Sequence, residues 1–188
     1  MEIKEKNYFI YFGNKNNSID PDCYKNPEKP EYLDFLDKNI KDFGLENLVF
    51  AKQTHGTNGF VVNEDFIKVC ALRSPWAKHG WQLESDYIIT DQKNIAIGVL
   101  TADCLPIILV ESQVCAVIHA GWRGAVNGII ENCVNNLINN IYQRGIAVLI
   151  SDDPILISAT DTCSKGTIAT NKLKNFINTS TLTDKIFH

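Results

Sequence analysis

Residues 94–124 read NIAIGVLTADCLPIILVESQVCAVIHAGWRG, and this stretch decides the fold. It contains two apolar runs, 95–100 and 114–118, and each ends at a polar cluster: TADC at 101–104 and HAGWRG at 119–124. Short apolar runs of this kind are typical of buried strands, so the clusters place reactive side chains at strand ends. A third cluster, KQTHG at 52–56, follows the apolar run 48–51. We therefore expect one cysteine and two histidines to converge.

The composition indicates a single domain over residues 1–188. The chain is 45% hydrophobic and 21% charged, which provides enough apolar side chains for a sizeable core. Its formal net charge is −4 and its pI is near 5.5. Its 18 lysines and arginines form no long block. Because partners such as nucleic acid and anionic membranes are bound by basic surfaces, we expect neither partner here.

The cysteine pattern and the absence of targeting signals predict a cytoplasmic protein in a reducing environment. No CxxC pair occurs, so a disulfide framework is not expected. The N-terminal sequence MEIKEKNYFI lacks a signal-peptide pattern, and no apolar run approaches the roughly 20 residues of a membrane span. The six cysteines are Cys23, Cys70, Cys104, Cys115, Cys133 and Cys163.

The periodicity predicts strands and helices around the central stretch. Pro30 opens a helical pattern that ends at Gly44, and a second pattern runs from Ala125 to Gly145. The runs 86–90 and 95–100, separated by the turn DQKN, predict a hairpin. Further strands are expected at 7–12, 47–51, 59–63, 107–110, 114–118, 146–150 and 155–158. We also expect a long loop at 14–30 and a short helix at 171–178. The region 64–84 is predicted to be irregular, and within it the segment 67–72 fits a strand or a helix.

Three side chains at the strand ends suit a catalytic zinc site. Such a site needs three protein ligands and one open position, and a thiolate with two imidazoles is an accepted set. Cys104, His55 and His119 fit by type, and both histidines precede glycine-containing turns that allow close approach. The alternatives are an ordinary core cysteine, as we expect for Cys115 and Cys133, and turn histidines bonded to the backbone. His79 and His188 lack this context.

Four motifs, in this order, resemble the YfiH-like family: KQTHG (52–56), SDYIIT (85–90), LTADCLPIIL (100–109) and HAGWRG (119–124). Members were first called multicopper polyphenol oxidases or laccase-domain proteins, and later zinc-dependent purine nucleoside phosphorylases. The resemblance covers roughly residues 48–142. It implies an α/β (α+β) sandwich of mixed sheets flanked by helices. The catalytic domain of cytotoxic necrotising factor toxins has a similar fold and deamidates glutamine with a Cys–His pair.

The resemblance also implies a metal site and substrates. The family's metal-binding residues fall on His55, Cys104 and His119. Members phosphorolyse adenosine, inosine, guanosine and methylthioadenosine, and deaminate adenosine, so purine nucleoside and phosphate become the expected partners. The sequence leaves the oligomeric state open, with a homodimer as one alternative because a shortened sheet often recruits a partner. Zinc lowers the pKa of a bound water from 15.7 towards about 7, which suits deamination.

Further residues receive roles or plain alternatives. Cys104, His119 and Asp103 are the catalytic candidates, with Asp103 either a proton donor to the departing purine or a turn-stabilising residue. Arg123 could bind phosphate at the turn 121–124 before the helix at Ala125, or form a surface salt bridge. Trp122 could stack on a purine or simply pack in the protein. Gln53 matches a substrate-binding position of the family. Asp86 could orient the imidazole of a metal ligand.

Composition argues against the oxidase chemistry. Multicopper oxidation needs two histidines, a cysteine and usually an axial methionine at one copper, as well as a histidine-rich copper cluster. This chain has four histidines and one methionine, the initiator. Copper could therefore occupy a single site, but not a multicopper centre.

The two ends depart from the family pattern. Members carry an arginine and a Gly-Gly-x-Ser turn near the N-terminus, where this chain reads YFGNKNNS at 11–18. After Gly145 the family's Gly-Pro segment and Tyr-Glu-Val are missing, and we expect a domain shortened at the C-terminus. Two alternatives to the zinc enzyme therefore stay open: a metal-free cysteine hydrolase that uses Cys104 and His119, and a catalytically degenerate metal-binding member.

Overall fold

The computed structural model describes residues 2–4, 8–13, 29–71, 83–111, 114–143 and 156–158. Two compact units make up the chain, Met1–Leu45 and Glu46–His188. The predicted single domain over 1–188 stays a prediction. Several predicted elements lie outside the described residues: most of the loop 14–30, the segment 73–81 with His79, the strand 146–150 and the helix 171–178.

The first unit contains a two-stranded sheet and one helix. Strand β1 (Glu2–Lys4) pairs antiparallel with β2 (Phe9–Tyr11). Helix α2 (Pro30–Phe43) confirms the predicted helix: a proline stands at its start and Gly44 ends it in the left-handed conformation at φ 64°. The ring of Phe43 lies 5.4 Å from the ring of Phe9 and 4.9 Å from that of Tyr11, which joins the helix end to β2.

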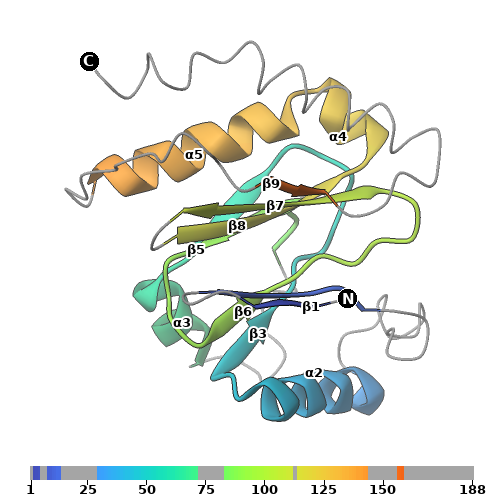
Figure 1. Cartoon of the computed structure of the whole chain (residues 1–188), viewed down its shortest axis with the longest axis vertical. Helices are drawn as coiled ribbons and strands as arrows, with labels where there is room; N and C mark the ends of the chain where they lie inside the picture. Colours follow the sequence, from blue (N-terminus) through green and yellow to red (C-terminus); the bar gives the residue numbers. More distant parts are fainter. Residues whose placement is uncertain are drawn as a thin grey trace. The chain divides into compact units, whose positions relative to one another are not determined.

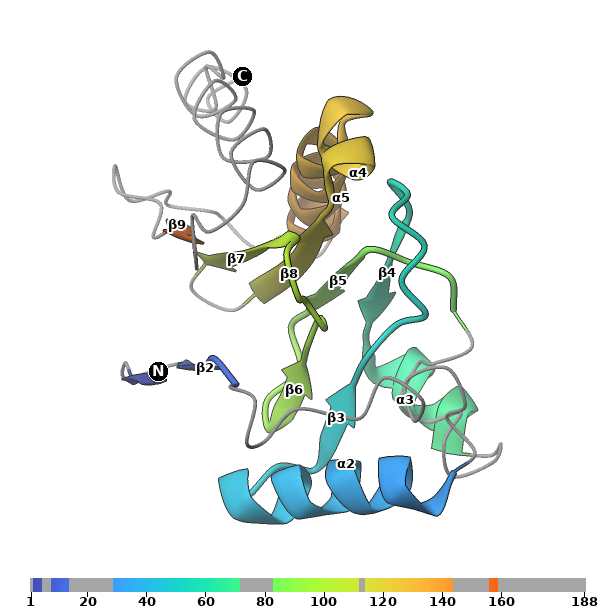
Figure 2. The same cartoon turned by 90° about the vertical axis from the view of Figure 1, so that its right-hand side faces the viewer.

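The second unit is built on a mixed five-stranded sheet with the strand order β4-β5-β8-β7-β9, in which Figure 2 labels all the strands (Figures 1 and 2). Strand β4 is parallel to β5, and the other neighbours are antiparallel. Strands β7 and β8, which pair with each other, both come from residues 94–124, the stretch with which the sequence analysis begins. The strands are β4 (Gly59–Val62), β5 (Tyr87–Thr90), β7 (Leu105–Glu111), β8 (Val114–Ala120) and β9 (Leu156–Ser158).

A second, smaller sheet corrects the predicted hairpin. Strand β3 (Asn47–Val49) pairs in parallel with β6 (Ile95–Ile97), so β6 is not a partner of β5 (Figure 2). All four residues of β5 are buried, and this strand already has β4 and β8 as neighbours on its two sides. The hairpin prediction is therefore wrong: the apolar pattern shows that two strands exist but does not specify their partners.

The helices of this unit settle two further predictions. Helix α3 (Glu64–Ala71) resolves the ambiguous segment 67–72, and the Asn63 side chain accepts a hydrogen bond from the Phe66 amide at 2.8 Å at its start. The single helix predicted from Ala125 is in fact two, α4 (Trp122–Val126) and α5 (Ile129–Gln143). Gly128 separates them at φ 90°, a conformation that favours glycine.

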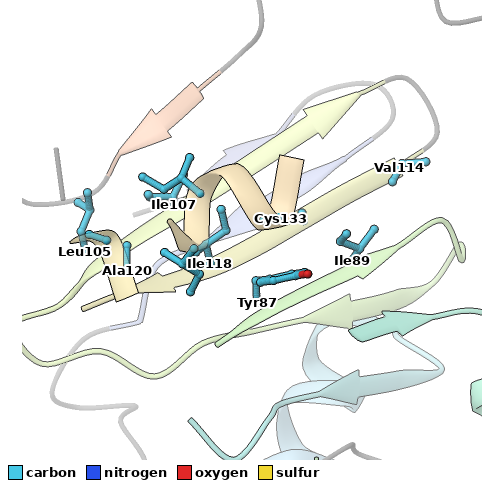
Figure 3. Packing of buried hydrophobic residues seen from close by; sticks show 12 residues of the cluster. Tyr87, Ile89, Leu105, Ile107, Val114, Ile118, Ala120 and Cys133 are labelled. Carbon is cyan, nitrogen blue, oxygen red and sulfur yellow. The ribbon is translucent and has the colours of Figure 1, made fainter. Parts of the chain in front are cut away.

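Helix α5 covers one face of the large sheet (Figures 1 and 3). Ile129, Ile130 and Cys133 of α5 belong to the same buried cluster as side chains of β5, β7 and β8. The opposite face is buried as well, because Ile88 and Val117 pack with Val49, Ala51 and Val62. The labelled members of the first cluster in Figure 3 are Tyr87, Ile89, Leu105, Ile107, Val114, Ile118, Ala120 and Cys133.

With both faces of the sheet filled by apolar side chains, reactive groups are left to the strand ends. Burial raises the pKa of the Cys115 thiol to about 11, and it raises that of Cys133 further. Cys133, which is fully buried between α5 and the sheet, has the core role that the sequence predicts, whereas Cys115 on β8 is partly exposed. Within the described ranges, no helix combines the length and the apolar character that crossing a bilayer requires.

Candidate metal centre

Three side chains from separate segments of the second unit converge at one end of the large sheet. His55 lies in the loop after β3, Cys104 directly precedes β7, and His119 is the penultimate residue of β8. One candidate ligand atom from each lies within 4.8 Å of the other two. The two imidazole rings meet edge to face, with centroids 4.7 Å apart. Cys104 and His119 lie on or next to the adjacent strands β7 and β8. His55 follows β3, which lies in the other sheet, so the loop after β3 has to bring His55 to them.

A buried carboxylate organises this convergence. Asp86 directly precedes β5, and its side chain is 0% exposed. One carboxylate oxygen accepts hydrogen bonds from His119 Nδ1 at 2.8 Å and from the His55 amide at 2.9 Å. The other oxygen accepts from the Gly56 amide at 2.7 Å, and from the Thr54 amide and hydroxyl at 3.2 and 3.0 Å. Asp86 therefore fixes the His119 ring and three consecutive amides of the His55 loop.

The hydrogen bonds keep Asp86 ionised. Burial on its own raises the pKa of this carboxyl, but the hydrogen bond from His119, the backbone amides of Gly56 and His55, and the contact with Thr54 outweigh burial and hold the pKa at about 2. An ionised Asp86 accepts the Nδ1 proton of His119, which leaves Nε2 of a neutral ring with its lone pair. This is the tautomer that a metal ligand needs.

Because the folded pKa of Asp86 is depressed from 3.8 to about 2, its contribution to stability is present above pH 4 and is lost as the pH falls towards 2. We expect the stability advantage of the parent over Asp86→Ala to shrink by about 1 kcal/mol between pH 5 and pH 3. Urea unfolding of chelator-treated protein at both pH values measures it. A difference that stays constant or grows as the pH falls would contradict this assignment.

His55 has an unusual backbone that the carboxylate supports. Its φ of 61° lies in the left-handed region, which a non-glycine residue rarely occupies. The pKa of His55 is lowered, and the largest cause is desolvation by burial. The charges of His119 and Arg123 lower this pKa further, whereas those of Asp86 and Asp103 raise it. A lowered pKa favours the neutral imidazole, the form that binds metal.

Two glycines allow the segments to approach each other. A Cβ on Gly121 would lie 2.9 Å from His55 Cδ2 and 3.4 Å from Cys104 Sγ, and a Cβ on Gly124 would lie 2.6 Å from the Gly56 carbonyl oxygen. The second contact is with the main chain, which cannot rotate away as a side chain can. The spacing of glycines in HAGWRG thus matches the close packing of α4 against the His55 loop.

This packing gives a direct prediction. Gly124→Ala forces the Gly56 carbonyl to move and should destabilise the protein by about 1–3 kcal/mol, the usual range for an overpacked site. The displacement should also weaken metal binding, because His55 directly precedes Gly56 in the chain. Chemical denaturation and zinc titration measure the two effects. Val126→Ala on the same helix is the control, because Val126 is 57% exposed and should change stability by less than about 0.5 kcal/mol.

The other predicted site residues lie around the three candidate ligands. Asp103, Trp122 and Arg123 are exposed, and the Arg123 guanidinium lies 5.8 Å from the centre of the Trp122 ring. Helix α4 begins at Trp122, so the predicted turn at 121–124 ahead of a helix at Ala125 is wrong by three residues. The Gln53 side chain is hydrogen-bonded to the main chain of Leu100. The catalytic and substrate-binding roles of these residues stay predictions.

Sequence reasoning missed Thr54, which donates two hydrogen bonds to Asp86. No local signal could have found it, because the partner lies 32 residues further along the chain. The sequence shows that Gly121 and Gly124 follow an apolar run. It does not show which atoms pack against them, because these atoms come from the segments of His55 and Cys104.

Comparisons with known proteins identify relatives of this chain. The chain is 30% identical over 137 residues to a purine nucleoside phosphorylase of Clostridium acetobutylicum, a match that covers 71% of this chain and 50% of that protein. It is 40% identical over 95 residues to an adenosine deaminase from an unknown prokaryotic organism, covering 50% of this chain and 35% of that protein. The chain thus spans half the length of these curated relatives, or less.

A solved structure has the same fold. The crystal structure of the hypothetical protein YfiH from Bacillus licheniformis superposes with a TM-score of 0.52 at 21% identity, covering 82% of this chain and 57% of that one. Mixed sheets flanked by helices, as the sequence predicts, are therefore confirmed. Residues 36–153 match the family described as multi-copper polyphenol oxidoreductase laccase. Since this match spans more than half of the chain, the protein belongs to that family.

Proposed function

We propose that the protein holds a zinc ion on His55, Cys104 and His119 and acts on purine nucleosides, by phosphorolysis and by deamination of adenosine. The convergence of the three ligand atoms within 4.8 Å carries this proposal. Relatives named purine nucleoside phosphorylase and adenosine deaminase support the substrate class. Adenosine, inosine, guanosine and methylthioadenosine are the proposed substrates.

The residues fit zinc better than a multicopper centre. A thiolate and two imidazoles form a catalytic zinc set with three protein ligands and one open position. His119 would bind through Nε2, because its Nδ1 is hydrogen-bonded to Asp86. With only four histidines in the chain, a multicopper cluster has too few ligands, although a single copper ion would suit the same donors. When bound, zinc supplies a Lewis acid that activates water and polarises the substrate.

The surrounding side chains provide the remaining functions. Trp122 is 43% exposed and directly follows Gly121, so its ring can stack against a purine. The neighbouring Arg123 guanidinium would hold phosphate through a bidentate contact. Asp103, next to Cys104 in the chain, would donate a proton to the departing base. Asp86 orients His119 and does not touch the substrate.

One experiment separates the two activities. Purified protein is assayed for bound metal and then incubated with adenosine, with and without phosphate. Phosphorolysis converts adenosine and phosphate into adenine and ribose 1-phosphate, whereas deamination converts adenosine and water into inosine and ammonia. We expect adenine only with phosphate, inosine in both cases, and hypoxanthine when both reactions occur. Zinc-loaded protein that yields none of these products would instead support a degenerate metal-binding member.

The same geometry favours a second candidate, a metal-free cysteine hydrolase. Cys104 lies near His119, and His119 is oriented by Asp86, which is the arrangement of nucleophile, base and orienting carboxylate. This enzyme would stay active after chelation and would lose activity on alkylation of Cys104. The zinc enzyme would lose activity with the metal and regain it on zinc addition.

A further inference from the structure

A side-chain amide links the two loops that carry His55 and Cys104. The Gln53 carboxamide donates from Nε2 to the Leu100 carbonyl at 2.8 Å, and its Oε1 accepts from the Leu100 amide, also at 2.8 Å. Gln53 follows β3, and Leu100 follows β6, the parallel partner of β3. Figure 2 shows β3 and β6 side by side, and the Gln53 amide continues their pairing beyond the ends of the two strands.

We infer that Gln53 is a positioning residue that sets Cys104 against His55 by clamping both main-chain groups of Leu100. Gln53 lies two residues before His55, and Leu100 lies four residues before Cys104. The inference rests on the proposed function only in taking Cys104 and His55 as metal ligands. It assigns Gln53 a role on the protein side of the site, whereas the resemblance to the YfiH-like family implies a substrate contact.

The chemistry of the clamp requires an amide. At neutral pH, where carboxyl groups are ionised, a carboxamide offers the donor and the acceptor side by side in one plane that the main chain of Leu100 demands. A glutamate of the same length could accept from the Leu100 amide, but its second oxygen would face the Leu100 carbonyl. A methionine would fill a similar volume and make neither hydrogen bond.

The clamped segment is the connection that delivers Cys104. Residues 98–104 lead from β6 in the small sheet to β7 in the large sheet. At their start, the Gly98 amide donates to the Val49 carbonyl at 3.0 Å, and a Cβ on Gly98 would lie 2.5 Å from the Phe50 ring. Two residues after Gly98, the hydrogen bonds between Gln53 and Leu100 form a second link between the two segments. The path of the chain towards Cys104 is thereby fixed relative to the loop that carries His55.

The experiment uses Gln53→Met and Gln53→Glu, with Gln92→Met as the matched control. The Gln92 side chain bonds to the adjacent Asp91 at 2.6 Å, in the turn before β6, and links no loops of the site. Two readouts are taken in the absence of substrate. The first is zinc affinity, by competition with a chromophoric chelator. The second is hydrogen exchange at the Leu100 amide of the zinc-free protein, with the Gly98 amide as an internal reference.

For both Gln53 variants we expect zinc affinity to fall about tenfold or more, the scale found when residues behind metal ligands are removed. For Gln53→Met we expect exchange at Leu100 to rise about tenfold with Gly98 unchanged, because the opening is local. Gln53→Glu should not restore the parent affinity. Gln92→Met should match the parent in both measurements.

The two readouts distinguish this inference from the proposed function. A parent protein that binds no zinc overturns the zinc proposal, and exchange at Leu100 still tests the clamp. Unchanged exchange in Gln53→Met, or an affinity within twofold of the parent in a folded variant, overturns the inference. If neither Gln53 variant folds, the residue serves general stability, and the positioning role is likewise rejected.

Discussion

Asp86→Asn is expected to destabilise the protein by about 3 kcal/mol or more, because several donors lose a charged acceptor and each such hydrogen bond contributes roughly 1.5–3 kcal/mol. Both carboxylate oxygens of Asp86 accept hydrogen bonds from N–H groups. Either orientation of an asparagine amide would therefore direct its NH₂ group at amides of residues 54–56 or at the His119 ring. The variant loses hydrogen bonds and gains opposed donors, although its side chain has nearly the same shape.

Urea unfolding of zinc-free protein at neutral pH measures this effect, and a zinc titration follows it at the site. Glu84→Gln is the control, because the Glu84 side chain forms an exposed ion pair with Lys52 at 2.7 Å. Such pairs contribute at most about 1 kcal/mol. An Asp86→Asn variant within 1 kcal/mol of the parent would show that the carboxylate does not organise the His55 loop.

Cys104→Ala is expected to lower zinc affinity at least a hundredfold and to abolish turnover of adenosine. Loss of a partner behind the ligands already weakens metal binding about 10- to 100-fold, and loss of a ligand itself should exceed this. Both effects have one cause, so metal content and activity should fall together. Equilibrium dialysis against zinc and chromatographic product analysis measure them.

Cys115→Ala provides the matched control for Cys104→Ala. It makes the same substitution on β8, at a thiol whose pKa burial raises to about 11 and which therefore stays protonated. This variant should keep zinc and activity, whatever its effect on packing. If Cys104→Ala retains zinc and full turnover, the zinc enzyme is refuted. If it retains zinc and loses turnover, Cys104 acts as a nucleophile.

The convergence of His55, Cys104 and His119 could be predicted from sequence because each of the three polar clusters borders an apolar run. The strand expected to deliver Cys104 is wrong, since Cys104 directly precedes β7 and β6 lies in the other sheet. A strand that is buried on both faces leaves its ends as the place for polar chemistry. Helix α2 could be predicted as well, since Pro30 and Gly44 mark its ends with local chemistry that needs no tertiary contact. Residue types at these positions already indicated zinc, and the family resemblance matched the same three residues and added the substrate class.

What could not be predicted depends on long-range pairing. The apolar pattern of β6 fits several partners, and its pairing with β3 rather than β5 is decided by contacts between distant segments. The break at Gly128 was hidden because glycine is tolerated within helical patterns, and only its φ of 90° identifies it as a stop. The hydrogen bonds of Asp86 and Gln53 reach 30 to 47 residues along the chain, and no local signal reports them.

The three candidate ligands come from points far apart in the chain, and this has a thermodynamic consequence. His55 and Cys104 are 49 positions apart, so the proposed ion between them would act as a removable cross-link that closes a long loop. Only the folded state would present the complete set of ligands, and saturating metal would then shift the folding equilibrium by mass action. Availability of the ion would then govern how long the polypeptide survives proteolysis as well as what it catalyses.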